Sequence, residues 1–202
     1  MRWITSEEEL EQFYGTPNLS STAKVSRRIT PQYRALIDAS PFCALASVGD
    51  AGLDCSPRGD DGPVADVVDE STLAIPDRRG NNRIDTLRNI VRDPRISLMF
   101  MIPRCNTIVR VNGLARVTAD PRMCDRYTVR GSAPRTVILV RVSEVYFQCA
   151  RAILRARLWD GGFKEPANLP TPGEILDEIT ASAIDGKAYD AEWPGRAAKT
   201  MW

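Results

Sequence analysis

The hydrophobic pattern of the chain changes character near residue 41. Before it, capping signals predict two short helices, one from Ser6, where Glu9 completes a capping box, and one from Thr30-Pro31 that stops before Pro41. After it, apolar and β-branched runs separated by turn residues predict strands. We expect these strands at residues 42–48, 53–59, 64–69, 72–77, 95–102, 107–118 and 135–148.

Alternation within the strands predicts how they pack. In 107–118, Val109 and Val111 fall on one face and Arg110 on the other, while Gly113 in mid-strand indicates a bend or bulge. Six or seven mostly antiparallel strands with short helices between them are typical of a small closed or half-closed barrel. The fold class is therefore mainly β with flanking helices.

Three regions follow from this pattern. We expect an N-terminal helical segment over 1–40, the barrel over 41–160 and a C-terminal helical extension over 161–202. The extension begins with a Pro-rich connection after Gly161-Gly162, contains one helix near 172–183, and ends in a loose tail of about a dozen residues.

Composition narrows the chemistry. The net charge is +1, so we expect neither nucleic-acid nor membrane partners. No apolar run approaches the roughly 18 residues of a membrane helix, and the acidic start lacks a signal peptide's apolar region. We therefore expect a cytoplasmic protein. Histidine is absent and the five cysteines show no C-x-x-C spacing, which disfavours histidine-dependent triads and metal sites. A bound cofactor is the economical source of reactivity.

The stretch LAIPDRRGNNRIDTLRNIVRDP reads as a strand, a polar glycine turn and a helix that closes at Pro94. The turn concentrates arginines and asparagines at the exposed N–H groups of the expected helix, where Asn81 and Asn82 could cap it or donate hydrogen bonds. This arrangement suits a phosphate. A solvated turn whose arginines contact only water is an equal alternative.

A second polar feature lies on the strand LDCSPRG. Period-2 alternation places Asp54, Ser56 and Arg58 on one face, followed by Gly-Asp-Asp-Gly. Taken alone, such a face is most simply solvent-exposed. It is also a suitable place for a second phosphate or ring contact.

The blocks SPFCALASVGDAGLDCSPRGDDG, TLAIPDRRGNNRIDTLRNIVRDPRISLMF and TIVRVNGLARVT resemble the pyridoxamine 5'-phosphate oxidase-like flavin-binding proteins, in particular their FMN-dependent enzyme branch. The resemblance spans about residues 30 to 160. It implies a six-stranded Greek-key split β-barrel that dimerises with FMN at the subunit interface. The cofactor-binding residues that it implies are Arg58, Pro76, Asp77, Arg78, Arg79, Asn81, Asn82, Arg83 and Arg110. Arg151, Arg155 and Trp159 would come from the other subunit.

The resemblance implies an FMN-dependent oxidoreductase in which the isoalloxazine exchanges hydride at N5. The chain lacks the Arg-Lys pair and the histidine of true pyridoxamine phosphate oxidases, so vitamin B6 oxidation is not expected. An arginine-rich pocket suggests an anionic substrate or a nicotinamide reductant, and no catalytic residue can be assigned. The alternatives are a deazaflavin-using reductase, a non-catalytic flavin-binding or sensing protein and, more remotely, an RNA-binding barrel.

The strand ISLMFMI is apolar on nearly every position. Because a small barrel covers only one face of such a strand, we expect a homodimer that covers the other. The alternative is that the N-terminal helices cover it within one chain.

Overall fold

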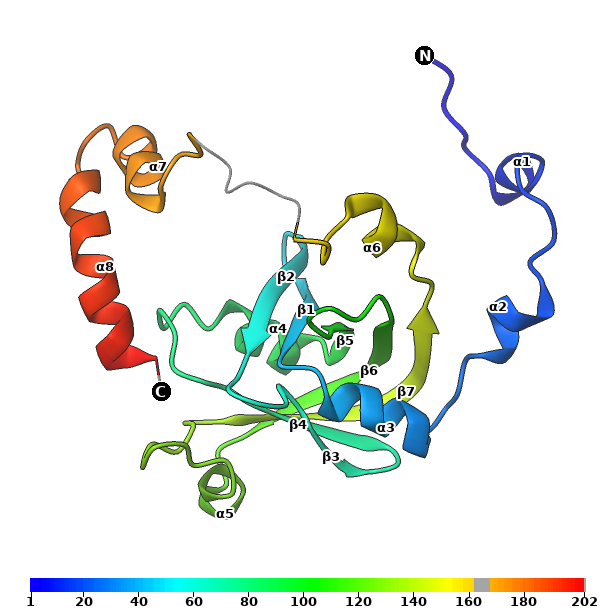
Figure 1. Cartoon of the computed structure of the whole chain (residues 1–202), viewed down its shortest axis with the longest axis horizontal. Coiled ribbons are helices and arrows are strands. Elements are labelled where there is room, and N and C mark those ends of the chain that lie inside the picture. Colours follow the sequence, from blue (N-terminus) through cyan, green and yellow to red (C-terminus); the bar gives the residue numbers. More distant parts are fainter. Residues whose placement is uncertain (162–167, 202) are drawn as a thin grey trace.

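A computed structural model of the chain describes residues 1–161 and 168–201, so the start of the expected Pro-rich connection, residues 162–167, lies outside the described residues. Its centre is one antiparallel sheet in the order β2-β1-β5-β6-β7-β4-β3 (Figure 1). The strands are β1 (Phe42–Gly49), β2 (Gly52–Gly59), β3 (Asp66–Asp69), β4 (Thr72–Pro76), β5 (Arg95–Met101), β6 (Ile108–Thr118) and β7 (Val137–Gln148). The described sheet therefore has seven strands, rather than six, and does not close, because β2 and β3 remain its two edges.

Eight helices surround this sheet in the described part of the chain. They are α1 (Glu7–Glu11), α2 (Leu19–Ala23), α3 (Pro31–Asp38), α4 (Asp85–Arg92), α5 (Pro121–Asp125), α6 (Arg151–Ala156), α7 (Pro172–Ile179) and α8 (Gly186–Thr200). Two differ from expectation. The pattern did not indicate α2, and the expected loose tail is wrong, since residues up to Thr200 form the longest helix.

The register confirms the irregularity expected at Gly113. The pairing of β6 with β7 shifts between Asn112 and Gly113. A Cβ on Gly113 would lie 2.3 Å from the carbonyl oxygen of Arg141, so only glycine fits this close approach of two strands. The bulge bends the sheet and lets its two ends curve towards each other.

Cross-strand pairing sorts the side chains onto two faces. Arg58, Cys43, Phe100 and Val109 are successive partners across β2, β1, β5 and β6, and the last three are buried on the inner face. Arg110 pairs with Met99 and therefore lies on the outer face. The sheet thus separates Arg58 from Arg110.

Helix α4 covers part of the inner face with half of the apolar face that its sequence indicates, namely Ile84, Leu87, Ile90 and Val91. Ile90 is buried and Leu87 packs against the core, whereas Ile84 and Val91 are exposed, by 47% and 78%. Thr86 and Asn89 are also buried, and Asn89 Nδ2 donates to Ser47 Oγ of β1 at 3.0 Å. Two polar residues of α4 therefore face the sheet.

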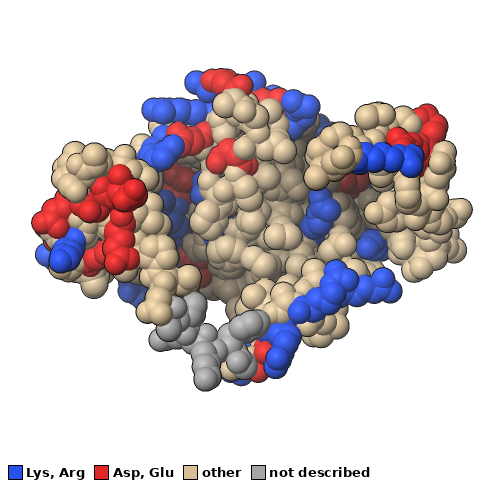
Figure 2. Space-filling view, turned by 90° about the horizontal axis from the view of Figure 1, so that it is seen from above, with Lys and Arg blue, Asp and Glu red and all other residues tan. Residues whose placement is uncertain are grey.

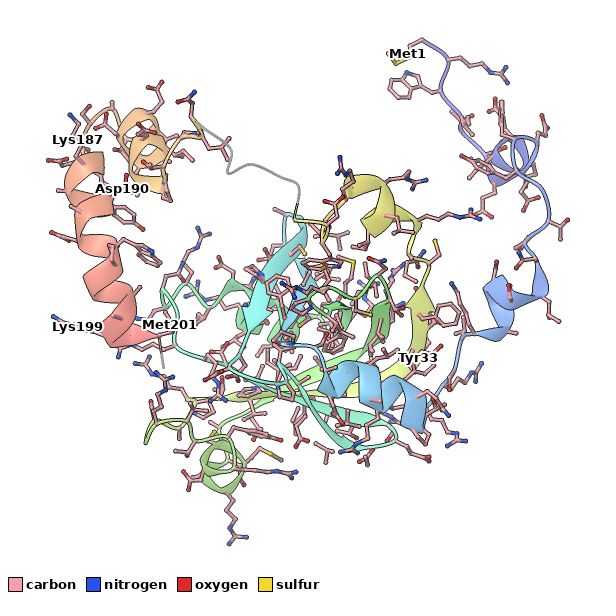
Figure 3. All side chains as sticks on the ribbon, in the orientation of Figure 1. Met1, Tyr33, Lys187, Asp190, Lys199 and Met201 are labelled. Carbon is pink, nitrogen blue, oxygen red and sulfur yellow. The ribbon has the colours of Figure 1, made fainter. Side chains whose placement is uncertain are left out.

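Two helical segments project on either side of the central body (Figures 1 and 2). Helices α1 and α2 form one, and helices α7 and α8 form the other. In the second, Gly173 and Gly186 bring the two helices into backbone contact, and the Asp190 carboxylate accepts bonds from Thr171 Oγ1 (2.5 Å) and Gly173 N (2.9 Å) (Figure 3). These contacts fix α8 against α7.

Neither a membrane span nor a metal site is present among the described residues. No helix there is long and apolar enough to cross a bilayer, and no group of three or more acidic or cysteine side chains is placed to hold an ion.

Candidate functional site: a cavity at the start of helix α4

The loop 77–83 joins β4 to α4 and forms one wall of a cavity of about 370 Å³. Strand β4 is buried up to Pro76, where its pairing with β7 ends, and the chain then turns out to the surface. The opposite wall is the inner face of β2. The cavity is lined by Asp54, Ser56, Arg58, Asp77, Arg78, Gly80, Asn81, Asn82, Arg83, Ile84, Asp85, Thr86 and Leu87.

Arg58 contributes a partly buried cation to this cavity. Its strand alternates, so that Asp54, Ser56 and Arg58 point inward while Leu53, Cys55 and Pro57 are exposed. Nη1 donates to the Pro57 carbonyl at 3.0 Å, but the buried Nε has no hydrogen-bond partner. A buried donor without a partner costs free energy, and a bound acceptor would remove that cost.

The first turn of α4 is a second set of free donors. Ile84 is the N-cap residue, in the left-handed conformation (φ 52°), and no side chain caps the helix. Of the two roles left open for Asn81 and Asn82, capping of this helix is therefore not observed. Asn81 Oδ1 accepts instead from the backbone N–H of Arg83 at 3.1 Å, and Asn82 itself adopts φ 61°. The N–H groups at the start of α4 remain available to an anion.

Hydroxyl groups complete the inner end of the cavity. The Asp54 carboxylate accepts from Thr86 Oγ1 at 3.4 Å and from Ser47 and Ser56 Oγ at 3.5 Å. Thr86 Oγ1 also lies 3.2 Å from Ser56 Oγ. Alternation had placed Asp54 and Ser56 on one face of β2, whereas the apolar pattern of α4 gave no signal for the polar residue Thr86.

The other arginines of the loop differ in how far they are available. Arg78 is largely buried, and its Nε donates to Asp60 Oδ2 (2.8 Å) while Nη1 donates to the Tyr127 carbonyl (2.6 Å). Arg83 has a side chain that is 75% exposed and pairs with Asp85 at 2.9 Å. Arg78 therefore anchors the loop, and Arg83 lies at the rim of the cavity.

Asp77 is the titratable group most altered by its surroundings in this cavity. Burial raises its pKa above the ordinary value, and the neighbouring Arg58 guanidinium opposes that rise. Asp77 therefore holds a proton more readily than an exposed aspartate does.

Two smaller hollows adjoin the same loop. One of about 240 Å³ lies between Arg79 and the segment 132–135, where Arg135 Nη1 donates to Asn82 Oδ1 at 3.4 Å. The other, of about 210 Å³, includes Pro76. Together the three hollows bring eight of the predicted site residues around one loop: Arg58, Pro76, Asp77, Arg78, Arg79, Asn81, Asn82 and Arg83.

The remaining predicted residues line none of these hollows. Arg110 lies on the outer face, with its guanidinium 5.2 Å from the centre of the Tyr146 ring. Arg151 is exposed on α6, as is Arg155. The half-buried Trp159 donates from Nε1 to the Cys105 carbonyl at 2.8 Å. Within one chain these residues do not meet the cavity.

The fold and the cavity define an antiparallel split-barrel protein with a cofactor-sized site beside the sheet. The profile of the pyridoxamine 5'-phosphate oxidase family, PNPOx_N, matches residues 29–149, more than half of the chain. The chain therefore belongs to this family, and membership supports flavin binding with FMN as the cofactor. No curated protein matches the chain.

Solved structures share the fold. HupZ of Group A Streptococcus is 17% identical with a TM-score of 0.50, over 60% of this chain and 94% of its own. A candidate pyridoxamine 5'-phosphate oxidase of Lactobacillus delbrueckii is 22% identical with a TM-score of 0.47, over 60% of this chain and 95% of its own. An FMN-binding protein of Syntrophomonas wolfei is 16% identical with a TM-score of 0.42, over 56% of this chain and 82% of its own. The likeness to HupZ confirms the split barrel, and identities this low carry no information on activity.

Proposed function

We propose that the chain is an FMN-binding flavoprotein that acts as an oxidoreductase, with the cofactor phosphate held in the cavity at the start of α4. One observation carries the proposal: the unpartnered Nε of Arg58 and the uncapped first turn of α4 face the same cavity. Each is a donor set that lacks an acceptor, and a phosphate would satisfy both.

The chemistry of the cavity fits such a group. Arg58 and the α4 N–H groups supply charge-assisted hydrogen bonds. The carboxylates in the lining have other roles. Asp85 pairs with Arg83, and Asp54 accepts from the hydroxyls. Among the carboxylates that line the cavity in the described structure, Asp77 alone forms no ion pair or hydrogen bond through its side chain.

When bound, FMN would supply hydride exchange at the flavin N5. The residues of this chain would bind and orient it. Arg78 holds the loop in place through Asp60 and Tyr127, and backbone amides of residues 79–82 can donate to a ring edge.

The proposal includes a homodimer. The outer face of the sheet exposes large apolar side chains at Leu53 (85%), Met99 (37%) and Leu114 (47%), and α1 and α2 do not cover them within one chain. Burial of this face against a second copy would also bring Arg110 to an interface, with Arg151 and Trp159 contributed by the partner. Exposed apolar area of this kind favours association.

The test is the small molecule that the purified protein releases on denaturation, followed by turnover. The proposal expects the mass of FMN and oxidation of a reduced nicotinamide with an electron acceptor. Release of a deazaflavin would contradict the cofactor assignment. FMN without turnover over a range of acceptors would identify a non-catalytic flavin-binding protein.

A further inference from the structure

A fourth hollow lies on the other side of the loop 77–83, between this loop and α8. It has a volume of about 530 Å³, the largest of those that the loop borders. Its walls are Arg79, Gly80 and the two asparagines on the loop side, and Tyr189, Trp193, Arg196 and Met201 on the α8 side. The C-terminal end of α8 lies close to this loop, and Met201 is at that end (Figures 1 and 3).

The composition of the pocket selects a ligand class. Its α8 wall presents two aromatic rings and a methionine, and the Trp193 side chain is half exposed although it lies on the side of the helix that faces the body. Both charged lining residues are arginines, and no aspartate or glutamate lines the pocket. On the visible face of the α7–α8 segment, by contrast, acidic side chains gather (Figure 2).

The two arginines are placed to receive an anion. Among the described residues, no carboxylate forms an ion pair with Arg79 or Arg196. The Arg196 guanidinium lies 4.7 Å from the centre of the Tyr189 ring and 5.4 Å from that of Trp193. Stacking of this kind fixes the guanidinium plane and leaves its N–H edge free for a carboxylate.

One wall of the pocket is ordered by contacts within the α7–α8 segment. Asp190 and the Gly173–Gly186 contact hold α8 against α7. A concave site of this volume, mostly apolar with few polar groups, is typical of small-molecule sites.

We infer that this pocket binds a planar aromatic anion, with its ring against Tyr189 and Trp193 and its acidic group on Arg196 and Arg79. The site is separate from the cofactor cavity, because the loop lies between them and they share only loop residues. Its use as the substrate site rests on the proposed flavin function, whereas the binding itself does not.

The experiment uses 2-naphthoate as the probe with the full-length, FMN-loaded protein. Binding is followed by the indole N–H signal of Trp193, assigned with a Trp193→Phe variant. We expect saturable binding with a shift of that signal, and at least tenfold weaker binding of both 2-naphthylmethanol, which lacks the charge, and cyclohexanecarboxylate, which lacks the ring.

Arg196→Gln removes the charge and keeps a good helix former. The variant should bind 2-naphthoate at least tenfold more weakly and FMN with unchanged affinity. The control variant Arg122→Gln, at an exposed position on α5, should bind both ligands as the wild type does. Equal affinity of the Arg196 variant and the wild type, absence of saturation at millimolar concentration, or competition between 2-naphthoate and FMN would overturn the inference. Binding of 2-naphthoate to a protein that takes up no FMN would contradict the proposed function and leave the inference standing.

Discussion

Replacement of Arg58 by methionine separates ligand binding from folding. The variant keeps an unbranched side chain of similar length and removes the guanidinium whose buried Nε has no partner in the ligand-free protein. If the FMN phosphate accepts from this group, the variant loses at least one charge-assisted hydrogen bond, worth about 1.5–3 kcal/mol. The dissociation constant for FMN should then rise roughly tenfold to hundredfold.

The same change should not reduce the stability of the ligand-free protein. The lost group donates only from Nη1 to the Pro57 carbonyl, and the cost of leaving Nε buried without a partner disappears with it. We expect the free energy of unfolding in urea to remain within about 1 kcal/mol of wild type or to increase.

Fluorescence titration of FMN and urea unfolding of the ligand-free protein measure the two effects. Arg83→Met is the matched comparison. The Arg83 side chain lies at the exposed rim of the cavity and pairs with Asp85, so its loss should raise the dissociation constant for FMN by about fivefold at most. The reasoning is refuted if Arg58→Met binds FMN as wild type does, or if Arg83→Met is the more damaging change.

Three other changes test separate parts of the structure. Because burial raises the pKa of Asp77, the folded state binds its proton more tightly than the unfolded state, and stability falls as pH rises through the folded pKa. Asp77→Asn should therefore gain stability over wild type in urea unfolding as the pH rises above the ordinary pKa of an aspartate, and a stability difference that is the same below and above that pKa would contradict this. Gly113→Ala places a Cβ 2.3 Å from the Arg141 carbonyl and should destabilise the fold by about 1–3 kcal/mol, again by urea unfolding, with FMN affinity of the folded protein unchanged. Burial raises the pKa of the Cys43 thiol to about 12, so Cys43 should not react with a thiol reagent at pH 8. The reagent should label the exposed Cys55 and Cys149 instead. Mass mapping that finds Cys43 labelled in the folded protein would contradict its burial in the core.

The local periodicity of apolar and polar residues was sufficient to predict much of the fold. Strand alternation predicted that Asp54, Ser56 and Arg58 share one face, and a mid-strand glycine predicted the bulge at Gly113, because both depend on neighbours in sequence. That the shared face points inward was not predicted. The strand–turn–helix unit around residues 73–92 was predicted for the same reason.

What the sequence could not supply was the tertiary partner of each polar group. Arg78 and Arg83 look alike in the motif, and only the fold brings Asp60 to the first and leaves the second at the surface. The apolar pattern of α4 grouped Val91 with Ile90, but in the fold Ile90 is buried together with Thr86, which contacts Asp54, and Val91 is exposed. Helix α8 was missed because Pro194 and two glycines interrupt its pattern, and its stability comes from the contact with α7.

The central claim is that the cavity at the start of α4 recognises a phosphate, and comparison of FMN with riboflavin tests it most directly. The two ligands share the ring and differ in the phosphate alone. With Arg58 and the first turn of α4 both donating to it, the wild-type protein should bind FMN at least about a hundredfold more tightly than riboflavin. Equal dissociation constants for the two ligands would show that the phosphate is not bound by this cavity and would contradict the account.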